Sequence, residues 1–168
     1  MAKVTLILGG ARSGKSARAL SFASNGPRTF IATAEALDQE MADRIAAHKA
    51  ERGEGWDLVE APLDLAGAIR TAAEPDRTIV ADCLTLWLSN LMHHQKDLPI
   101  ETRRLEDSLR NARGHVVLVS NEIGLGLAPM EPLSRAFRDA QGRLNQTIAA
   151  AADRVEFVAA GLPMVLKG

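Results

Sequence analysis

The sequence has little of what characterises secreted, membrane-spanning or nucleic-acid-binding proteins. It contains one cysteine, Cys83, so no disulfide can form within the chain, and this usage is typical of a reducing cytoplasm. No apolar run approaches the roughly 18 residues that a membrane-spanning helix needs. The net charge of −1 leaves no basic surplus for nucleic acid or an anionic membrane surface. These absences favour a cytoplasmic protein with no nucleic-acid partner and no membrane span.

The N-terminus also lacks the charged segment and cleavage site of a signal peptide, because the chain goes directly into the apolar run Val4–Leu8. What the chain does have is a globular composition, with 46% apolar and 24% charged residues. Its 168 residues suit one domain that can bury a substantial core. We therefore expect residues 1–168 to form a single domain.

Strand patterns and helix patterns alternate along the chain. Several strand-like runs are continuously apolar, which is typical of parallel strands buried on both faces of a sheet. This alternation predicts an α/β fold with a doubly wound, mostly parallel sheet. The segment His93–Glu101 contains Pro99 and is predicted to be the most mobile loop. The expected strands are Val4–Leu8, Arg28–Ala32, Trp56–Val59, Thr78–Ala81, His115–Ser120, Val155–Ala159 and Met164–Leu166, and the expected helices are Ala17–Ala23, Asp38–Arg52, Leu63–Ala73, Leu84–Met92, Thr102–Ala112 and Leu133–Ala151.

Residues Gly9–Ser16 read G-G-A-R-S-G-K-S, which is the complete G-x-x-x-x-G-K-[ST] pattern of a phosphate-binding loop. An apolar strand precedes the motif and a helix follows it, as the chemistry requires. The glycines allow main-chain N–H groups to surround the β-phosphate, and the helix N-terminus adds partial positive charge. Lys15 can reach the β- and γ-phosphates, and the Ser16 hydroxyl can bind Mg²⁺. The motif predicts a nucleoside triphosphate site.

The apolar run Thr78–Ala81 ends in a second candidate residue for nucleotide chemistry, Asp82. A carboxylate at the end of a buried strand can bind Mg²⁺ directly or through a water molecule. Many strands end in an aspartate at a turn, so the motif gains its weight from the phosphate loop in the same chain. We predict that Asp82 and Ser16 form a magnesium site.

His48 is the third informative residue, near the end of an expected helix that is rich in cations. A histidine near a helix C-terminus is electrostatically comfortable, so a solvated or capping role is one interpretation. The other is a nucleophile, because a neutral imidazole can attack an α-phosphorus and hold a nucleotidyl group covalently. In that role Lys49 and Arg52 would help to neutralise the phosphate charge.

Other polar groups are weaker candidates. His93 and His94 lack the spacing of metal ligands, because adjacent residues on a helix face apart. Asn121 and Glu122 follow the expected strand His115–Ser120, and the carboxyl ends of strands are where open α/β sheets bind ligands. Simple turn chemistry accounts for these two residues equally well.

Taken together, the motifs resemble those of one family, the bifunctional adenosylcobinamide kinase / adenosylcobinamide-phosphate guanylyltransferases of cobalamin biosynthesis. The phosphate loop is generic, whereas the segments around His48 and Asn121 are far more specific. The stretch Leu91–Arg104 departs from the family pattern, and we expect it to affect how the family's corrinoid substrate docks. The matching segments run in order over essentially the whole chain and are Ile7–Ser16, Ile31–Ala34, Asp38–His48, Asp82–Leu91, Val119–Gly126 and Phe137–Gln146.

The resemblance implies two reactions. First, ATP or GTP phosphorylates the aminopropanol hydroxyl of adenosylcobinamide. Second, GTP transfers GMP to a histidine with loss of pyrophosphate, and the GMP then passes to adenosylcobinamide phosphate to give adenosylcobinamide-GDP. By position in the matching segments, the guanylylated histidine is His48.

The resemblance also implies the site, the cofactor and the assembly. Family members are similar to RecA-type P-loop NTPases, use Mg²⁺ and assemble as homotrimers. The catalytic residues would be His48 and Lys15, and the metal ligands Ser16 and Asp82. The nucleotide contacts would fall on Gly9, Gly10, Ala11, Arg12, Ser13, Gly14, Lys15, Ser16, Thr33, Ala34, Glu35, Lys49, Ala50, Glu51, Arg52, Glu60 and Asp82.

Three alternative functions remain open from the residues alone. A small-molecule kinase without guanylyl transfer would use the same loop but would have no use for His48. A regulatory GTPase needs a guanine-reading N-K-x-D segment, and the nearest string, Gln95-Lys96-Asp97, does not match it. A nucleic-acid-dependent ATPase is disfavoured by the near-zero net charge.

Overall fold

Seven strands form one sheet in the computed structural model, which describes residues 3–23 and 26–168. The strands are β1 (Lys3–Gly9), β2 (Arg28–Ala32), β3 (Asp57–Glu60), β4 (Thr78–Asp82), β5 (His115–Asn121), β6 (Arg154–Ala159) and β7 (Leu162–Lys167). Their order in the sheet is β3-β2-β4-β5-β1-β6-β7. Every neighbouring pair is parallel except β6 and β7, which are antiparallel. The predicted mostly parallel sheet is therefore confirmed, and all seven expected strands are present with ends that differ by at most two residues.

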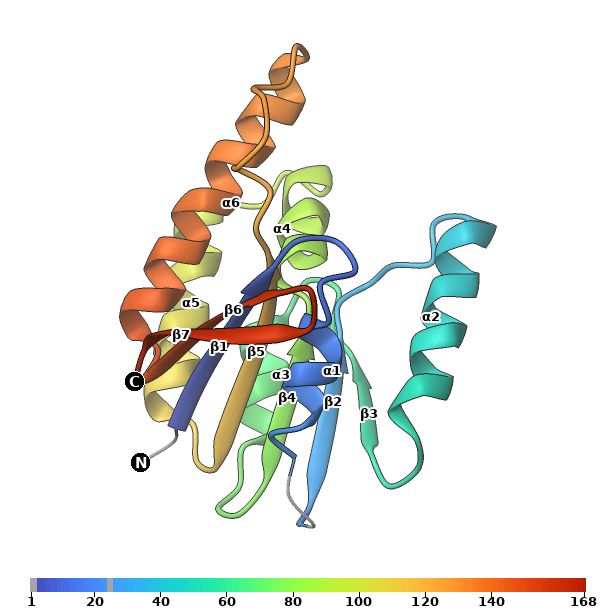
Figure 1. The fold of residues 1–168 in the computed structure, drawn as a ribbon. Helices are drawn as coiled ribbons and strands as arrows, with labels where there is room; N and C mark the ends of the chain where they lie inside the picture. The colour runs from blue at the N-terminus through green and yellow to red at the C-terminus, as the bar shows by residue number, and fades with distance from the viewer. Residues whose placement is uncertain (1–2, 24–25) are drawn as a thin grey trace.

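Helices lie on both faces of this sheet (Figure 1). They are α1 (Lys15–Leu20), α2 (Gln39–Arg52), α3 (Leu65–Ala72), α4 (Leu84–His93), α5 (Leu98–Asn111) and α6 (Pro132–Ala151). The helices α3 to α6 cover one face, and α1 packs on the other. Within the described residues, no helix is both long enough and apolar enough to cross a bilayer.

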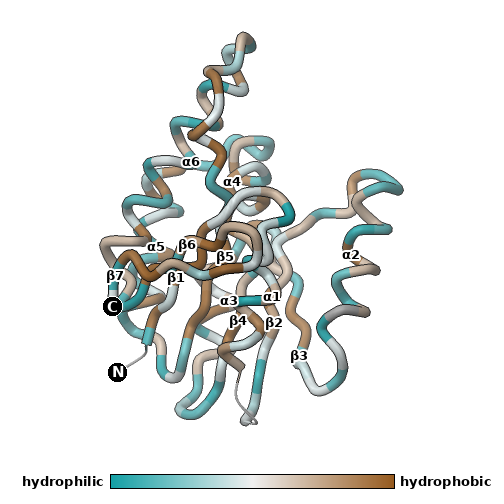
Figure 2. Tube along the Cα trace, viewed as in Figure 1, coloured by the Kyte–Doolittle hydropathy of each residue, from teal (hydrophilic) through white to brown (hydrophobic). Residues whose placement is uncertain are grey.

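Two apolar layers, one on each face, hold the sheet between the helices. Adjacent residues of a strand point to opposite faces, so Leu6 and Ile7 of β1 are both fully buried but belong to different layers. Leu6 packs with the side chains of α3 to α6, whereas Ile7 packs with Ala19 of α1. The hydropathy colouring shows the apolar strands inside and hydrophilic stretches on the outer helices (Figure 2). Burial on both faces explains why the strand sequences are continuously apolar.

The helix α2 is the exception, because it stands apart from the sheet and from the other helices (Figure 1). Asp38 caps its N-terminus, because the Asp38 side chain accepts a hydrogen bond from the Met41 amide at 2.7 Å. Its apolar side chains Met41 and Ile45 are only partly covered. A well-capped helix without a packed face depends on local interactions more than on the core.

The predicted mobile loop at His93–Glu101 is wrong in its second half, because α5 begins at Leu98. The Asp97 side chain caps this helix by accepting from the Ile100 amide at 2.9 Å. Pro99 lies in the first turn, where its missing N–H costs nothing. A proline near a helix start was thus mistaken for a loop residue, and the connection between α4 and α5 is only residues 94–97.

Candidate active site

The phosphate loop connects the end of β1 to the start of α1, and two of its glycines have no room for a side chain. A Cβ atom on Gly9 would lie 2.5 Å from the Ser13 hydroxyl oxygen and 2.7 Å from the Val158 carbonyl oxygen. Gly14 has a φ of 94°, in the left-handed region, and a Cβ atom there would lie 3.1 Å from the Gly161 Cα. The sequence motif therefore reflects close packing as well as conformational freedom.

Two neighbouring segments hold the loop through main-chain hydrogen bonds. The Gly161 amide, in the turn between β6 and β7, donates to the Ser13 carbonyl at 2.8 Å. The Glu122 amide, directly after β5, donates to the Gly9 carbonyl at 3.0 Å. The loop is thus fixed from both sides before any nucleotide binds, which is the preorganisation that electrostatic catalysis requires.

Lys15 is half-buried at the base of the loop, where its Nζ donates to the Gly10 carbonyl at 2.8 Å. Burial lowers the pKa of Lys15, and the negative charge of Asp82 opposes that shift by raising it. At the tip of the loop, Ala11 and Arg12 are exposed. The arrangement leaves a cation at the point where the motif places the β- and γ-phosphates.

The structure brings the last residue of the phosphate loop, Ser16, into contact with Asp82, although the two are far apart in the sequence. The Ser16 hydroxyl donates to Asp82 Oδ2 at 2.7 Å, so the first residue after Lys15 and the end of β4 meet. Within residues 3–23 and 26–168, no group of three or more histidine, cysteine or acidic side chains could hold a metal ion. One hydroxyl and one carboxylate nevertheless fit Mg²⁺, which is usually held by one or two carboxylates together with phosphates and water.

Thr33 lies just beyond β2 and is fully buried. Its hydroxyl donates to the Cys83 carbonyl at 2.7 Å and accepts from the Cys83 amide at 2.8 Å, while the Asn90 side chain donates to the Thr33 carbonyl. These bonds join the ends of β2 and β4, so the structure gives Thr33 a bracing role behind the site. Glu35 lies further out and contacts His94, with 3.2 Å between Oε1 and Nε2.

The predicted nucleophile, His48, lies on the exposed surface of α2, the helix that stands apart from the sheet (Figure 1). Lys49 and Ala50 are exposed beside it. The side chain of Glu51 lies outside the described part of the structure, so its predicted nucleotide contact is not described. The structure thus places His48 on a different element from the loop that holds Lys15.

The C-terminal end of α2 does reach the sheet, through Arg52. Its guanidinium lies 3.9 Å from the centroid of the Phe30 ring, over β2. Burial lowers the pKa of Arg52, while the charge of Asp82 raises it, so this cation is within electrostatic reach of Asp82. The remaining predicted contacts follow neighbouring strands at the same edge: Ala34 comes after β2 and is partly buried, and Glu60 ends β3 and is exposed.

A buried polar cluster below the site was missed by the sequence reasoning. Ser120 donates to Asn145 Oδ1 at 2.6 Å, and the Gln141 amide donates to both residues at 2.9 Å. The signal was available, because Gln141 and Asn145 are four residues apart on the apolar stripe of the α6 pattern. The cluster fixes the end of β5, from which Asn121 leads into the site.

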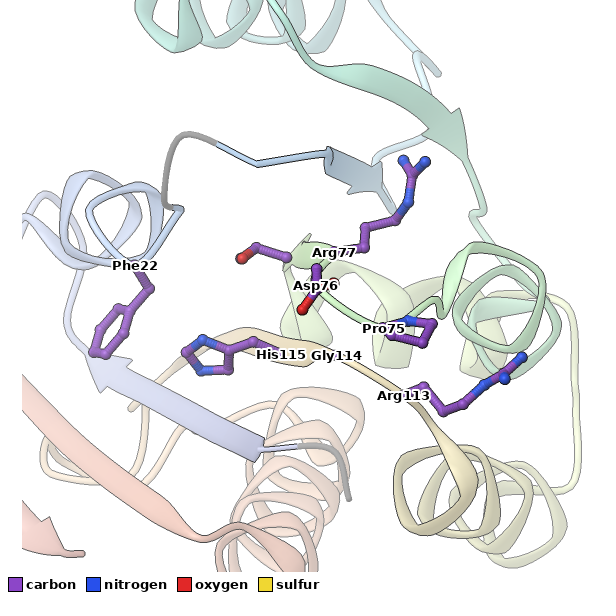
Figure 3. A pocket seen from close by; sticks show the side chains of 8 residues that line it. Phe22, Pro75, Asp76, Arg77, Arg113, Gly114 and His115 are labelled. Carbon is purple, nitrogen blue, oxygen red and sulfur yellow. The ribbon is translucent and has the colours of Figure 1, made fainter.

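A hollow of about 520 Å³ at the opposite edge of the sheet has no comparable chemistry (Figure 3). His115 lies in it, stacked edge-on against Phe22 at 5.6 Å between ring centroids. Arg77 and Arg113 carry their guanidinium groups away from His115. Burial lowers the pKa of His115, which is bonded to the Thr5 hydroxyl at 2.9 Å, so this histidine is a packing residue.

Solved structures of distantly similar sequence share this fold. The chain superposes on the flagellar accessory protein FlaH from Methanocaldococcus jannaschii with a TM-score of 0.54 and 12% identity, covering 98% of this chain and 78% of that one. A type III secretion system ATPase of pathogenic bacteria gives a TM-score of 0.56 at 12% identity, covering 97% of this chain and 56% of that one. At such identity the likeness shows the fold alone, and it confirms the predicted P-loop α/β class.

Sequence relatives are much closer. A bifunctional adenosylcobalamin biosynthesis protein, CobP, from Pseudomonas aeruginosa is 48% identical, over 97% of this chain and 96% of its own length. CobU from Salmonella typhimurium, which carries the same description, is 37% identical over 96% of this chain and 98% of its own. The family model described as cobinamide kinase / cobinamide phosphate guanyltransferase matches residues 5–166. With a complete phosphate loop, the Ser16–Asp82 pair and near full-length similarity, the chain belongs to this enzyme family of cobalamin biosynthesis.

Proposed function

We propose that the chain catalyses both reactions of its family at the carboxyl edge of the sheet. In the first, ATP or GTP phosphorylates adenosylcobinamide, and in the second, GMP from GTP is transferred to the resulting phosphate. The observation that carries the proposal is the 2.7 Å hydrogen bond from Ser16 to Asp82. Ser16 directly follows Lys15 in the phosphate loop. A cation, a hydroxyl and a carboxylate in this order complement a triphosphate with its metal ion.

The nucleotide-binding set proposed from the motifs fits this edge of the sheet. Ser16 and Asp82 would hold Mg²⁺, which would supply positive charge to neutralise the phosphates. Lys15 would leave the Gly10 carbonyl and bind the β- and γ-phosphates, and the loop amides would surround the β-phosphate. The contacts of Lys15 and Ser16 would replace hydrogen bonds that these side chains now make within the protein.

His48 is proposed to be the nucleophile of the second reaction. A nitrogen of its neutral imidazole attacks the α-phosphorus of GTP, the bond to the bridging oxygen breaks, and pyrophosphate leaves with the electron pair. A phosphate oxygen of the acceptor then attacks the same phosphorus, and the imidazole leaves. Because few contacts tie α2 to the sheet, this helix can change its position relative to the loop at small energetic cost.

Labelling with GTP and Mg²⁺ in the absence of corrinoid tests this role. We expect a mass increase of one GMP per chain, release of pyrophosphate, and a label on the peptide that contains His48. The adduct should be labile in acid and stable in alkali, because a phosphorus–nitrogen bond breaks readily once the imidazole is protonated. Labelled pyrophosphate should also exchange into GTP.

The control variants separate the bifunctional enzyme from a plain kinase. His48→Ala should abolish labelling and exchange while retaining much of the phosphorylation of adenosylcobinamide, whereas His93→Ala should label normally. An adduct in His48→Ala would place the nucleophile elsewhere. If the wild-type protein forms no adduct but still phosphorylates adenosylcobinamide, the kinase without guanylyl transfer is the better account.

The assembly and the compartment are proposed from the family resemblance. A cytoplasmic homotrimer of the 18.0 kDa chain is the expected form. Light scattering at micromolar concentration should give three times the chain mass. A strict monomer would contradict the trimer without affecting the nucleotide chemistry at the phosphate loop.

A further inference from the structure

Asn121, the last residue of β5, carries an unsatisfied acceptor beside the phosphate loop. Its side-chain oxygen Oδ1 is buried and has no hydrogen-bond partner among the described residues. Its main chain is held on both sides, because its amide donates to the Thr85 hydroxyl at 2.9 Å and its carbonyl accepts from the Asn145 side chain at 3.2 Å. A buried acceptor left unpaired costs free energy, so a fixed one at a ligand edge indicates a donor that arrives with the ligand.

The sheet register places this side chain on the same face as the phosphate chemistry. Asn121 lies opposite Gly9 on β1, and two residues earlier Val119 lies opposite Asp82 on β4. Side chains two residues apart share a face of the sheet, and Val119 packs in the apolar layer of α1. Ser120 points the other way, into the polar cluster with α6. The Asn121 side chain therefore lies on the same face of the sheet as Asp82, two residues further along β5 toward its carboxyl end.

A groove begins where the chain leaves Asn121. It has a volume of about 560 Å³ between α4, α6 and the segment that joins β5 to α6. Ile123, two residues after Asn121, is part of its wall, together with Met92 and Phe137, and Ser89, Ser134 and Arg138 supply polar groups. Two residues span at most about 7 Å, so the groove wall at Ile123 begins within that distance of the Asn121 Cα, beyond the carboxyl end of β5.

We propose that the acceptor alcohol of the kinase reaction binds in this groove and that Asn121 orients its hydroxyl for attack on the γ-phosphorus. The proposal rests on the kinase activity proposed above. A cobinamide acceptor presents apolar ring edges and side-chain amides, which match a groove with apolar walls and a few donors. Its hydroxyl would supply the hydrogen bond that Asn121 Oδ1 lacks.

The chemical step balances without a base at Asn121. The hydroxyl oxygen forms a bond to the γ-phosphorus, the bond from that phosphorus to the β–γ bridging oxygen breaks, and the nucleoside diphosphate leaves with the electron pair. The hydroxyl proton passes to an oxygen of the transferred phosphoryl group and then to solvent. Asn121 accepts the hydrogen bond and does not take the proton, a positioning by an amide that phosphoryl-transfer enzymes use for attacking water.

The first experiment replaces the acceptor atom. In Asn121→Leu the kcat for phosphorylation of adenosylcobinamide should fall about 100-fold, because a poorly oriented nucleophile loses rate of that order. The same preparation should keep its labelling by GTP, so the ratio of kinase rate to labelling rate should fall by a similar factor. A kinase rate within threefold of wild type, or equal losses in both reactions, would overturn the role. Asn111→Leu, an exposed asparagine on α5, is the matched control.

The second experiment fills the groove. Ser89 is exposed on α4, so Ser89→Trp adds bulk to the groove without disturbing the core. The control variant Gln146→Trp places the same bulk at an exposed position of α6. Ser89→Trp should raise the KM for adenosylcobinamide at least tenfold and leave the KM for the nucleotide unchanged, whereas Gln146→Trp should change neither. Unchanged acceptor KM, or a change of oligomeric state in place of a KM effect, would overturn the groove assignment.

Failure of this proposal is distinguishable from failure of the proposed function. If wild-type protein phosphorylates adenosylcobinamide and the Asn121 and Ser89 variants behave like it, only the acceptor site is wrong. If the wild-type protein does not phosphorylate adenosylcobinamide, the kinase assignment itself fails and the acceptor site falls with it.

Discussion

The phosphate-loop edge and the helix α2 carry the two predicted catalytic residues in opposite physical settings. At the loop edge, Lys15 is half-buried, Ser16 bonds to Asp82, and main-chain bonds fix the loop from two neighbouring segments. On α2, His48 is exposed on a helix with little packing. The same chain therefore combines a rigid electrostatic site with a loosely attached helix.

The ion pairs of the two regions differ in the same way. Glu156 on β6 is fully buried, and its carboxylate accepts from Arg18 of α1 at 2.7 and 2.8 Å and from Arg154 at 2.8 Å. On α2, Glu40 and Arg44 pair at 2.9 Å with both side chains largely exposed. The ion pair of Glu156 with Arg18 holds α1 to the sheet. The ion pair of Glu40 with Arg44 lies on the surface of α2 and joins no two elements.

This difference suits the two proposed reactions, one at the γ-phosphorus and one at the α-phosphorus of a nucleoside triphosphate. Charge stabilisation of a triphosphate needs groups that are fixed before the reaction, because their reorganisation would cost free energy in the transition state. A nucleophile that first attacks the α-phosphorus and then passes the nucleotide to an acceptor needs freedom to move. The comparison predicts that changes at the loop edge will affect chemistry and global stability, whereas changes on α2 will remain local.

The largest expected effect is at Lys15. Lys15→Ala removes the half-buried cation of the loop, so both phosphorylation of adenosylcobinamide and labelling by GTP should fall by about 100-fold or more. Steady-state kinetics and intact-mass labelling check this, with Lys96→Ala as an exposed control. Ample kinase activity in Lys15→Ala would remove the basis for treating the loop edge as the electrostatic site.

Asp82 should give the next largest loss. Asp82→Asn keeps the shape of the side chain but removes a charge from a hard-cation site, so activity at low Mg²⁺ should fall about 10- to 100-fold and excess Mg²⁺ should recover part of it. A Mg²⁺ titration of the kinase rate measures this. Full activity of the variant at low Mg²⁺ would make Asp82 a turn residue that merely bonds to Ser16.

The buried and exposed ion pairs predict a contrast in stability. Glu156→Gln leaves Arg18 and Arg154 without their carboxylate, and should lower the free energy of unfolding by about 3 kcal/mol. Glu40→Gln on α2 should cost less than about 0.5 kcal/mol. Urea unfolding at neutral pH compares the two variants. Equal effects would show that α1 is not held to the sheet by this pair.

The same pair predicts a pH dependence with a definite sign. The hydrogen bond from Arg18 lowers the pKa of Glu156 below its ordinary value of 4.5 in the folded protein. A carboxylate with a lowered folded pKa stabilises the protein above its unfolded pKa and loses that contribution as the pH falls through the folded pKa. The gap between wild type and Glu156→Gln should therefore be full above pH 4.5 and shrink progressively below it. A gap that widens in acid would contradict this assignment.

The smallest expected effect lies in the body of α2. Ala47→Gly weakens the helix locally by about 1 kcal/mol, yet it should leave the global urea midpoint unchanged, because α2 adds little to the core. Gln146→Gly on α6 should lower global stability by about 0.5–1 kcal/mol, since α6 unfolds with the core. Hydrogen exchange should show α2 amides opening much more readily than those of β1. A common loss of global stability in both variants would mean that α2 is part of the core.

The sequence predicted most of the fold and the family, and the comparisons confirm both. Continuous apolar runs identified the buried parallel strands because burial on both faces removes the usual alternation. The start of α5 was predicted wrongly because proline is common both in loops and in the first turn of a helix. The capping role of Asp97, which settles the matter, depends on the local backbone geometry.

By itself the sequence determined the local chemistry, and only the tertiary structure decided which groups meet. The G-x-x-x-x-G-K-S pattern fixed the phosphate loop, because its function depends on consecutive main-chain groups and one turn of helix. The contact of Ser16 with Asp82, the burial of Glu156 and the unpaired oxygen of Asn121 depend on strand order, which joins residues far apart in the chain. Likewise, the helical pattern of α2 indicated a helix, but its separation from the sheet follows from packing that no local spacing encodes.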